Sequence, residues 1–504
     1  MRPHSFQRFM LDQISEGQID WKELSDDYDN CVFVDSDGKA EFIPIWKNLA
    51  KFRSEMIKRY PKHEGALMQF FQLVETTCKG FIFFPIIKVM PYWIGFLAMK
   101  LKLYALVTNF FTAFHYKTLA NLFQQLFGDD EEIKTVLGYS WGDYGVEPSR
   151  VGFGMLSLIH EHYSRGAFYP VGGASEIPYN IIPVIEQSGG KVLVNAKVTD
   201  ILLDNNRMSA MGVTVDTSGG PVEIKAKMVI SAAGVSNTFK KLLPKQVAVN
   251  TQVGRLLESG KIRSGYGSFQ VFIGLKGSQS NLQLPNKNMW IYYGKNMEAE
   301  LQKFFAMNLD QASDDETNFP FLYVAFPSAK DPTYNERFPD KSVITILTFI
   351  PTTWFMKWED EKIKRRGNDY KSYKTKLARK CWERVCDLFP HLRDHLDYID
   401  AGSPLSNQFY LNAFAGEAYG LECNTERFSP DVSFALRPQI REIDNFFLTG
   451  QDILTCGFLA ALVSGYLTAH SILSTTGENS MLMADVKNLY VKCKKEALNQ
   501  AKHN

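Results

Sequence analysis

The stretch NFFLTGQDILTCGFLAALVSGYLTAHSIL, residues 445–473, decides the fold. Its apolar start predicts a buried strand over Phe446–Thr449, which leads into a turn at Gly450. A second glycine, Gly457, is expected to open a helix that runs to Leu473. Free amides at a helix N-terminus favour negative charge, and glycine lets a flat ring or a phosphate approach the backbone.

The side chains in this corner suit a cofactor with a sugar chain. Asp452, beside Gln451, is a candidate acceptor for ribityl or ribose hydroxyls. The amides of Gly457–Leu459 are candidates to stabilise the negative pole of a reduced flavin ring. An ordinary strand–turn–helix corner produces the same short pattern, so spacing alone leaves both interpretations open.

A second glycine pair lies in YPVGGASE, residues 169–176. Gly172 and Gly173 precede a helix expected over Ser175–Gln187, which Ser175 is a candidate to cap. The turn has no side chains at the two glycines to obstruct a ligand. A simple helix start is the alternative reading.

Short β-branched segments follow this helix and alternate with Asn-Asn and Gly-Gly turns. They predict a small β-meander that enters a parallel sheet. The expected strands are Lys191–Asn195, Lys197–Leu203, Met208–Val215 and Val222–Ala233.

The remaining chain divides into a helical beginning and a mixed later part. Amphipathic patterns predict helices around Trp46–Arg59, Glu64–Cys78 and Thr118–Phe127. Strands are expected at Ser268–Leu275, Met289–Tyr293, Phe321–Phe326 and Val343–Ile350, in a sheet with one covered face, followed by a helix near Tyr370–Leu388. A last basic helix is expected to carry Lys487, Lys492, Lys494, Lys495 and Lys502.

Residues 81–111 are strongly apolar and aromatic, but lysines and prolines interrupt the run, which disfavours a single spanning helix. Two interpretations remain open. One is a buried helical pair, and the other is a patch that dips into a bilayer with its lysines, Lys88 among them, at headgroup level and with Tyr92 and Trp93 as anchors.

Composition excludes several functions for this 504-residue chain. The 56 Lys+Arg against 55 Asp+Glu give a net charge of +1, so a nucleic-acid partner is not expected. The seven scattered cysteines contain no C-x-x-C pair, and His160 and His162 lie on opposite faces of a predicted helix, which favours surface histidines over a metal site. We therefore expect neither a disulfide framework nor a metal.

The sequence lacks the glycine motif that dinucleotide cofactors usually require. G-x-G-x-x-G between a strand and a helix is not found, and the nearest matches, Gly152-Phe153-Gly154 and Gly265-Tyr266-Gly267, do not complete it.

Longer strings nevertheless carry a specific resemblance. FMLDQISEGQIDW, GAFYPVGGASEI, VISAAGVSNT, AFPSAKDPTYNERFP, AGSPLSNQFYL and LTGQDILTCGF make the chain similar, almost end to end, to the phytoene desaturase and carotenoid isomerase group of flavoproteins. The resemblance implies a mixed α/β fold with a discontinuous, Rossmann-like FAD domain of glutathione-reductase type, incomplete at its N-terminal end, and a mixed α+β substrate domain with an apolar, membrane-facing helical region.

The resemblance also implies which residues hold the cofactor. Those carried over by motif to FAD are Gly172, Gly173, Val198, Gly450, Gln451, Asp452, Gly457, Phe458 and Leu459. Val198 would contact the adenosine end through its backbone. No catalytic residue is assigned, and NAD(P)H is a candidate electron source.

On this resemblance we expect residues 1–165 to form a mainly helical, membrane-facing substrate region and residues 166–250 the middle part of the FAD domain. Residues 251–404 would form the substrate-domain sheet and helix, and residues 405–504 the end of the FAD domain and a basic tail.

The implied activity is saturation of one double bond of a retinoid, the 13,14 bond of all-trans-retinol, by hydride transfer from reduced flavin. The implied partners are a retinoid or carotenoid-like lipid and the membrane surface, and the implied location is the endoplasmic reticulum membrane, peripheral or monotopic. A redox-neutral polyene isomerase, a desaturase on the same fold, and a catalytically inert form that lacks the pyrophosphate loop are alternatives.

Overall fold

The computed structural model describes residues 5–477 except residues 82, 104–109, 207, 315–316 and 318, and in addition residues 488 and 491. The predicted basic helix with Lys487, Lys492, Lys494, Lys495 and Lys502 lies outside the described residues.

A seven-stranded sheet is the largest strand layer. Neighbouring strands are antiparallel except for the parallel pair β10–β2. The four strands predicted between residues 268 and 350 are confirmed, but three further strands were not predicted. In order across the sheet the strands are β13 (Leu396–Gly402), β9 (Gly267–Lys276), β12 (Lys341–Ile350), β11 (Phe321–Ala325), β10 (Asn288–Tyr292), β2 (Asp29–Val34) and β3 (Ala40–Ile45).

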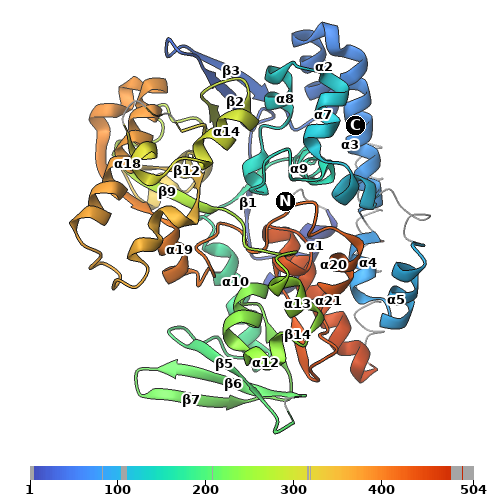
Figure 1. Ribbon diagram of the computed structural model, residues 1–504. Coiled ribbons are helices and arrows are strands. Elements are labelled where there is room, and N and C mark those ends of the chain that lie inside the picture. The colour runs from blue at the N-terminus through green and yellow to red at the C-terminus, as the bar shows by residue number, and fades with distance from the viewer. Residues whose placement is uncertain are drawn as a thin grey trace.

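The two faces of this sheet pack against different layers because side chains alternate along each strand. On β10, Met289 and Ile291 belong to the core beneath α18 (Asn368–Leu388), whereas Trp290 and Tyr292 belong to the core under the N-terminal helices. Both faces are therefore covered at β10, so the expectation of one covered face was wrong there, whereas at β9 one face is buried and Phe272 on the other face is 44% exposed. Figure 1 shows the sheet between α18 and the helices drawn in blue and cyan.

The N-terminal helices confirm the three predicted amphipathic stretches. The predicted helices are α2 (Leu49–Arg59), α3 (Glu64–Gly80) and α7 (Leu119–Phe127). The same layer also contains α8 (Glu131–Leu137) and α9 (Phe153–Ser164). The prediction of surface histidines on α9 was wrong for His160, which is buried. Its Nε2 lies 3.0 Å from the Leu137 carbonyl oxygen, and its ring packs against Phe52 and Phe70. Burial lowers the pKa of His160 to about 4.

The apolar segment forms two short helices, α4 (Phe83–Val89) and α5 (Tyr92–Lys100), that are largely open to solvent. Pro91 separates them because it cannot continue a helix. The bilayer interpretation would put Lys88 at headgroup level, but it is 1% exposed and donates to the carbonyl oxygens of Ser433 and Leu436 at 2.6 and 2.8 Å. The outward side chains define the α4–α5 patch: Phe83, Ile86, Trp93, Ile94, Phe96 and Leu97.

The predicted meander is confirmed as an antiparallel sheet of β5 (Lys197–Leu203), β6 (Ala210–Thr217) and β7 (Gly220–Lys225). It leads into β8 (Val229–Ser231), which pairs in parallel with β14 (Phe446–Leu448). The strand predicted at Lys191–Asn195 was wrong. Among the described residues no strand lies beside that segment to pair with its backbone, and Val194 is 81% exposed.

Helix α10 (Glu176–Gln187) confirms the predicted helix, but Ser175 does not cap it. The Ser175 backbone is itself helical, whereas a capping side chain needs an extended backbone to reach back to the next amides. The other elements are α1 (Phe6–Ser15), β1 (Trp21–Glu23), β4 (Phe168–Pro170), α11 (Val235–Asn237), α12 (Lys245–Ala248), α13 (Gln252–Glu258), α14 (Met297–Phe305), α15 (Leu309–Ser313), α16 (Pro327–Lys330), α17 (Tyr334–Arg337), α19 (Pro404–Tyr410), α20 (Pro430–Ala435) and α21 (Phe458–Thr476).

Candidate cofactor corner

The parallel strands β8 and β14 end at the same edge, and a glycine turn follows each of them. Gly234 and Gly450 have φ of 84° and 94°, and Gly457, at the start of α21, has φ of 97°. A Cβ added at Gly450 would meet its nearest neighbour only at 4.0 Å, and one at Gly457 would meet nothing within 4 Å. The backbone at these turns is therefore open on the side where a side chain would otherwise stand.

Gln451 closes the loop between the two glycines. Its Oε1 accepts the Gly457 amide at 2.9 Å, while Ser464 of α21 donates to the Gly450 carbonyl oxygen at 2.6 Å. The first amides of α21 beyond Gly457 have no earlier helical carbonyl to bind, as at any helix N-terminus. The corner therefore presents backbone donors beside open space.

Asp452 joins three segments of the chain. Its Oδ1 accepts the Leu421 amide and its Oδ2 the Val235 amide, both at 2.8 Å, and the residue is 4% exposed. Two main-chain amides therefore occupy one acceptor position on each oxygen. The role of Asp452 toward a sugar hydroxyl stays a prediction and depends on the remaining lone pairs.

Arg427 hydrogen-bonds to the backbone of the same loop. It is 2% exposed, and its guanidinium donates to four main-chain carbonyl oxygens and one thiol. These acceptors are Leu421, Gln451, Asp452, Leu454 and the Sγ of Cys423.

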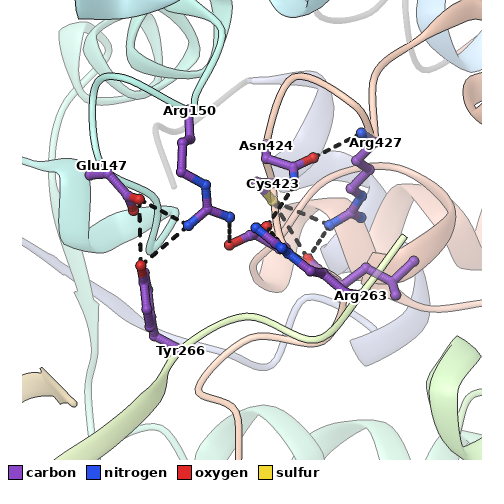
Figure 2. A network of polar contacts seen from close by, with 9 residues as sticks. Glu147, Arg150, Arg263, Tyr266, Cys423, Asn424 and Arg427 are labelled. Carbon is purple, nitrogen blue, oxygen red and sulfur yellow. Dashed lines mark hydrogen bonds and ion pairs between the residues drawn. The ribbon is translucent and has the colours of Figure 1, made fainter. Parts of the chain in front are cut away.

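A polar network continues from Arg427 to the N-terminal helices (Figure 2). Glu422 accepts Arg263 Nε at 2.9 Å and Asn424 Nδ2 at 2.6 Å, and it also pairs with Arg150. Arg150 in turn donates to Glu147 at 2.9 Å. Because the Glu422 side chain is 4% exposed, these contacts supply the donors that its buried charge requires. The segment that binds Asp452 is thereby held to the helical layer.

Two thiols meet inside this corner. Cys423 and Cys456 hydrogen-bond each other, and the hydrogen bond from Cys456, with help from Arg427, lowers the pKa of Cys423 to about 7 against the effect of burial. Cys456 Sγ also lies 3.5 Å from the main-chain oxygen of Asp143. The short segment around Asp143 therefore reaches the cofactor corner.

Asp143 is the acid that reasoning from sequence missed. Its Oδ2 is shielded from solvent and has no hydrogen-bond partner among the described residues. Burial, and then the charge of Asp29, raise its pKa well above the usual range, which favours the protonated form of the carboxyl group. The preceding Gly142 carbonyl oxygen accepts the Tyr419 hydroxyl at 3.0 Å. No motif marks Asp143, since a single Asp in a short loop has no distinctive spacing.

Asp29 is a second buried acid on the sheet side. It accepts Trp290 Nε1 at 2.8 Å and Asn288 Nδ2 at 2.7 Å, and burial raises its pKa to about 7. Tyr28 and Tyr139, whose hydroxyls are 2.9 Å apart, have pKa values raised first by burial and then by nearby groups that include both acids. Buried groups that can hold protons thus extend from the sheet to the cofactor corner.

The other predicted residues occupy separate places. Gly172 and Gly173 have φ of 93° and 99°; the Gly172 amide donates to Asp331 at 3.2 Å, and Gly173 has open space beside it. Val198 lies in β5, paired with Val215. Helix α10, which follows Gly172 and Gly173, packs with α1 and with Leu459 of α21 in one small core.

At the start of α21, Phe458 is 43% exposed, whereas Leu459 is half-buried. The residues of this corner fit the ring and ribityl part of a flavin, because they combine open backbone, free amides and a supporting carboxylate. The printed sequence holds no G-x-G-x-x-G loop for the pyrophosphate.

Among the described residues, no group of three or more His, Cys, Asp or Glu side chains is placed to hold a metal ion. Two helical stretches, Pro61–Val89 and Phe458–Thr475, are long and apolar enough to cross a membrane, although core helices of soluble proteins meet the same criterion.

Comparison with known proteins agrees with this chemistry. The family model described as flavin containing amine oxidoreductase matches residues 107–473. The human all-trans-retinol 13,14-reductase is 37% identical over 97% of this chain and 78% of its own length. A zebrafish (Danio rerio) protein named inactive all-trans-retinol 13,14-reductase is 30% identical over 97% of this chain and 78% of its own length.

Among solved structures, cyclohexylamine oxidase from Brevibacterium oxydans superimposes with a TM-score of 0.53 at 11% identity, over 93% of this chain and 86% of that one. This likeness shows the mixed α/β fold. The family model and the relatives establish that the chain belongs to the flavin-containing amine oxidoreductases, in the branch that includes the all-trans-retinol 13,14-reductases.

Proposed function

We propose that this chain is an FAD-dependent oxidoreductase that saturates the 13,14 double bond of all-trans-retinol. The observation that carries the proposal is the open glycine corner beside the buried acid Asp143. The named activity of the human relative supports the choice of substrate. NAD(P)H is the proposed source of electrons.

In this proposal the segment Gly450–Leu459 holds the ring and ribityl chain of FAD. Gly172 and Gly173 line the cofactor side of their turn, and Val198 supports the adenosine end through its backbone. When bound, reduced flavin supplies a hydride. The protein keeps water away from the reacting bond and orients it.

Asp143 supplies the proton that completes the addition. Its Oδ2 has no hydrogen-bond partner among the described residues, and burial raises its pKa, which favours the protonated carboxyl group that delivers this proton. A general acid of this kind contributes roughly a hundredfold or more to the rate. The released carboxylate is reprotonated from water.

The substrate enters from a lipid phase in this proposal. The α4–α5 patch exposes six large apolar side chains, and Trp93 alone is 69% exposed. Such a surface lies in the interface of a bilayer with its aromatic rings at headgroup level. We propose peripheral or monotopic attachment to the endoplasmic reticulum membrane.

Two measurements test the function. The first is the visible spectrum of the purified chain after incubation with FAD and removal of excess, beside that of an N-terminally extended product of its transcript. The second is anaerobic incubation of the flavin-loaded protein with dithionite and all-trans-retinol. A product heavier by two hydrogens supports the reductase, whereas an isomer of unchanged mass supports the isomerase.

A non-catalytic, lipid-binding protein is the second candidate. The absence of G-x-G-x-x-G from the printed sequence and the relative named inactive favour it. If neither form of the chain retains flavin while both bind vesicles, this second candidate replaces the enzyme. A desaturase would show itself instead by loss of two hydrogens from a more saturated polyene.

A further inference from the structure

A cavity of about 260 Å³ lies where α5 meets α13 and the segment after α20. Its lining combines Tyr92 of α5, Gln252 of α13, and Arg437 and Arg441. Arg437 is 8% exposed, and Arg441 is exposed at the mouth with its guanidinium carbon 3.9 Å from the centre of the Tyr92 ring. The cavity thus has one guanidinium inside and one at its opening.

Arg437 and Arg441 form no ion pair among the described residues. Among the described residues, no carboxylate lies within 4.0 Å of either guanidinium, although the surface elsewhere has many ion pairs. Arg437 Nη2 donates to the Met90 carbonyl oxygen at 2.7 Å, but its buried Nη1 has no partner among the described residues.

Neighbouring groups add to this charge. Burial, and then Arg441, lower the pKa of Arg437, and burial, followed by Arg427 and Arg437, lowers the pKa of Lys88. Glu442 also lines the cavity, where its carboxylate offsets part of the positive charge while its Oε1 accepts the Gln252 amide at 2.8 Å. A buried guanidinium nitrogen with no acceptor costs free energy that a bound anion would recover.

The cavity is joined to the α4–α5 patch. A Cβ at Gly95 would lie 2.3 Å from the Phe434 ring, so glycine lets α5 sit directly on α20. Tyr92 packs on Phe434 at 4.9 Å between ring centres, and Lys88 binds carbonyl oxygens at the end of α20. The exposed apolar helices and the arginine cavity therefore form one unit.

We propose that this cavity binds the phosphate of an anionic phospholipid at the surface of the bilayer in which the α4–α5 patch lies. The apolar patch supplies affinity for any bilayer, and the two arginines select phosphate-bearing anionic headgroups. Arg437 binds the phosphate from inside and Arg441 from the mouth, since guanidinium groups match phosphate oxygens in geometry. The proposal rests on the membrane attachment given above and is independent of the redox activity.

The test uses the full-length chain and two kinds of vesicle, phosphatidylcholine alone and phosphatidylcholine with about one phosphatidylserine in five lipids. Flotation measures the bound fraction. We expect tighter binding to the anionic vesicles, and Arg441→Gln is expected to reduce this preference about fivefold. Arg437→Gln is expected to reduce it by at least as much.

Arg255→Gln is the matched control, because Arg255 is exposed on α13 and does not line the cavity. It removes the same charge, so an equal loss for Arg255→Gln and Arg441→Gln would overturn a specific site. Replacing the buried Arg437 risks a folding defect. Arg441 is exposed, so a loss of preference in Arg441→Gln is not explained by misfolding. Trp93→Ala should weaken binding to both vesicles alike.

Inorganic phosphate separates a soluble anion from a headgroup. We expect phosphate alone to raise the melting temperature little and to leave vesicle binding unchanged. If phosphate stabilises the wild type but not Arg437→Gln while anionic vesicles have no advantage over neutral ones, the headgroup proposal fails. Absence of binding to both vesicles would instead refute the membrane attachment itself.

Discussion

The middle of the seven-stranded sheet and the middle of β8 differ in how far the described residues cover them. Ile346, in the middle of the large sheet, is fully buried, whereas Ile230 of β8 is 50% exposed. Val194 and Tyr179, in the same half of the molecule, are 81% and 72% exposed. Side chains of the protein itself thus bury the middle of the sheet. The cofactor half leaves apolar surface and open turns exposed, as a ligand-binding region does.

The largest effect is expected from removing a core side chain of the sheet. Phe269→Ala on β9 should lower the free energy of unfolding by about 3–5 kcal/mol, because the fully buried ring leaves a cavity. Chemical denaturation measures this loss. Phe272→Ala is the control on the same strand, since Phe272 is 44% exposed and should cost far less. Equal losses of unfolding free energy in the two variants would contradict the difference in burial between Phe269 and Phe272.

Asp29 should make the junction between the two regions sensitive to pH. Its folded pKa of about 7 lies above the ordinary value of 3.8 for an aspartate, so the native state binds the proton more tightly. Stability from this group is full below the unfolded pKa and is lost as pH rises to about 7, by up to about 4 kcal/mol.

The measurement is chemical denaturation of the wild type and of Asp29→Asn at several pH values between the unfolded pKa of Asp29 and pH 7. The difference between their free energies of unfolding gives the contribution of Asp29. Lys330 titrates above this pH range, because burial lowers its pKa only to about 8. A variant with the same pH dependence as the wild type would show that Asp29 is not the group responsible.

In the cofactor half, Asp143→Asn should lower turnover of all-trans-retinol by roughly a hundredfold while flavin binding is retained, because the amide cannot deliver the proton. Infrared spectroscopy gives an independent readout, since the carbonyl stretch of a protonated carboxylic acid should be lost in the variant. Asp360→Asn, at an exposed position, is the control. Unchanged turnover would remove Asp143 from the mechanism.

The smallest effect concerns the open turn. Gly457→Ala should weaken FAD binding about tenfold, because alanine is strained at a φ of 97° and its methyl group enters the open space. Fluorescence titration with FAD measures the affinity. Gly465→Ala, exposed inside α21 with nothing within 4 Å of an added Cβ, should leave the affinity unchanged and stabilise the helix slightly. Equal affinities for the two variants would argue against a flavin at this corner.

Local patterns in the sequence predicted most individual elements. The period of 3.6 located α2, α3, α7 and α18, and the short β-branched runs located β5 and β9–β12. Continuous burial hid β2, whose six residues are all buried and show no alternation. The segment Lys191–Asn195 failed for the opposite reason, because β-branched residues form a strand only where a neighbouring strand accepts their hydrogen bonds.

The sequence by itself determined the glycine corner from Gly450 to Leu459, since a strand, two glycines and an apolar helix are local features. Only the tertiary structure decided that Asp143 and Cys423 reach that corner and that Lys88 is buried. It also decided that Arg437 lacks a carboxylate among the described residues. Charge compensation and burial depend on residues hundreds of positions apart, and no local pattern encodes which of them meet.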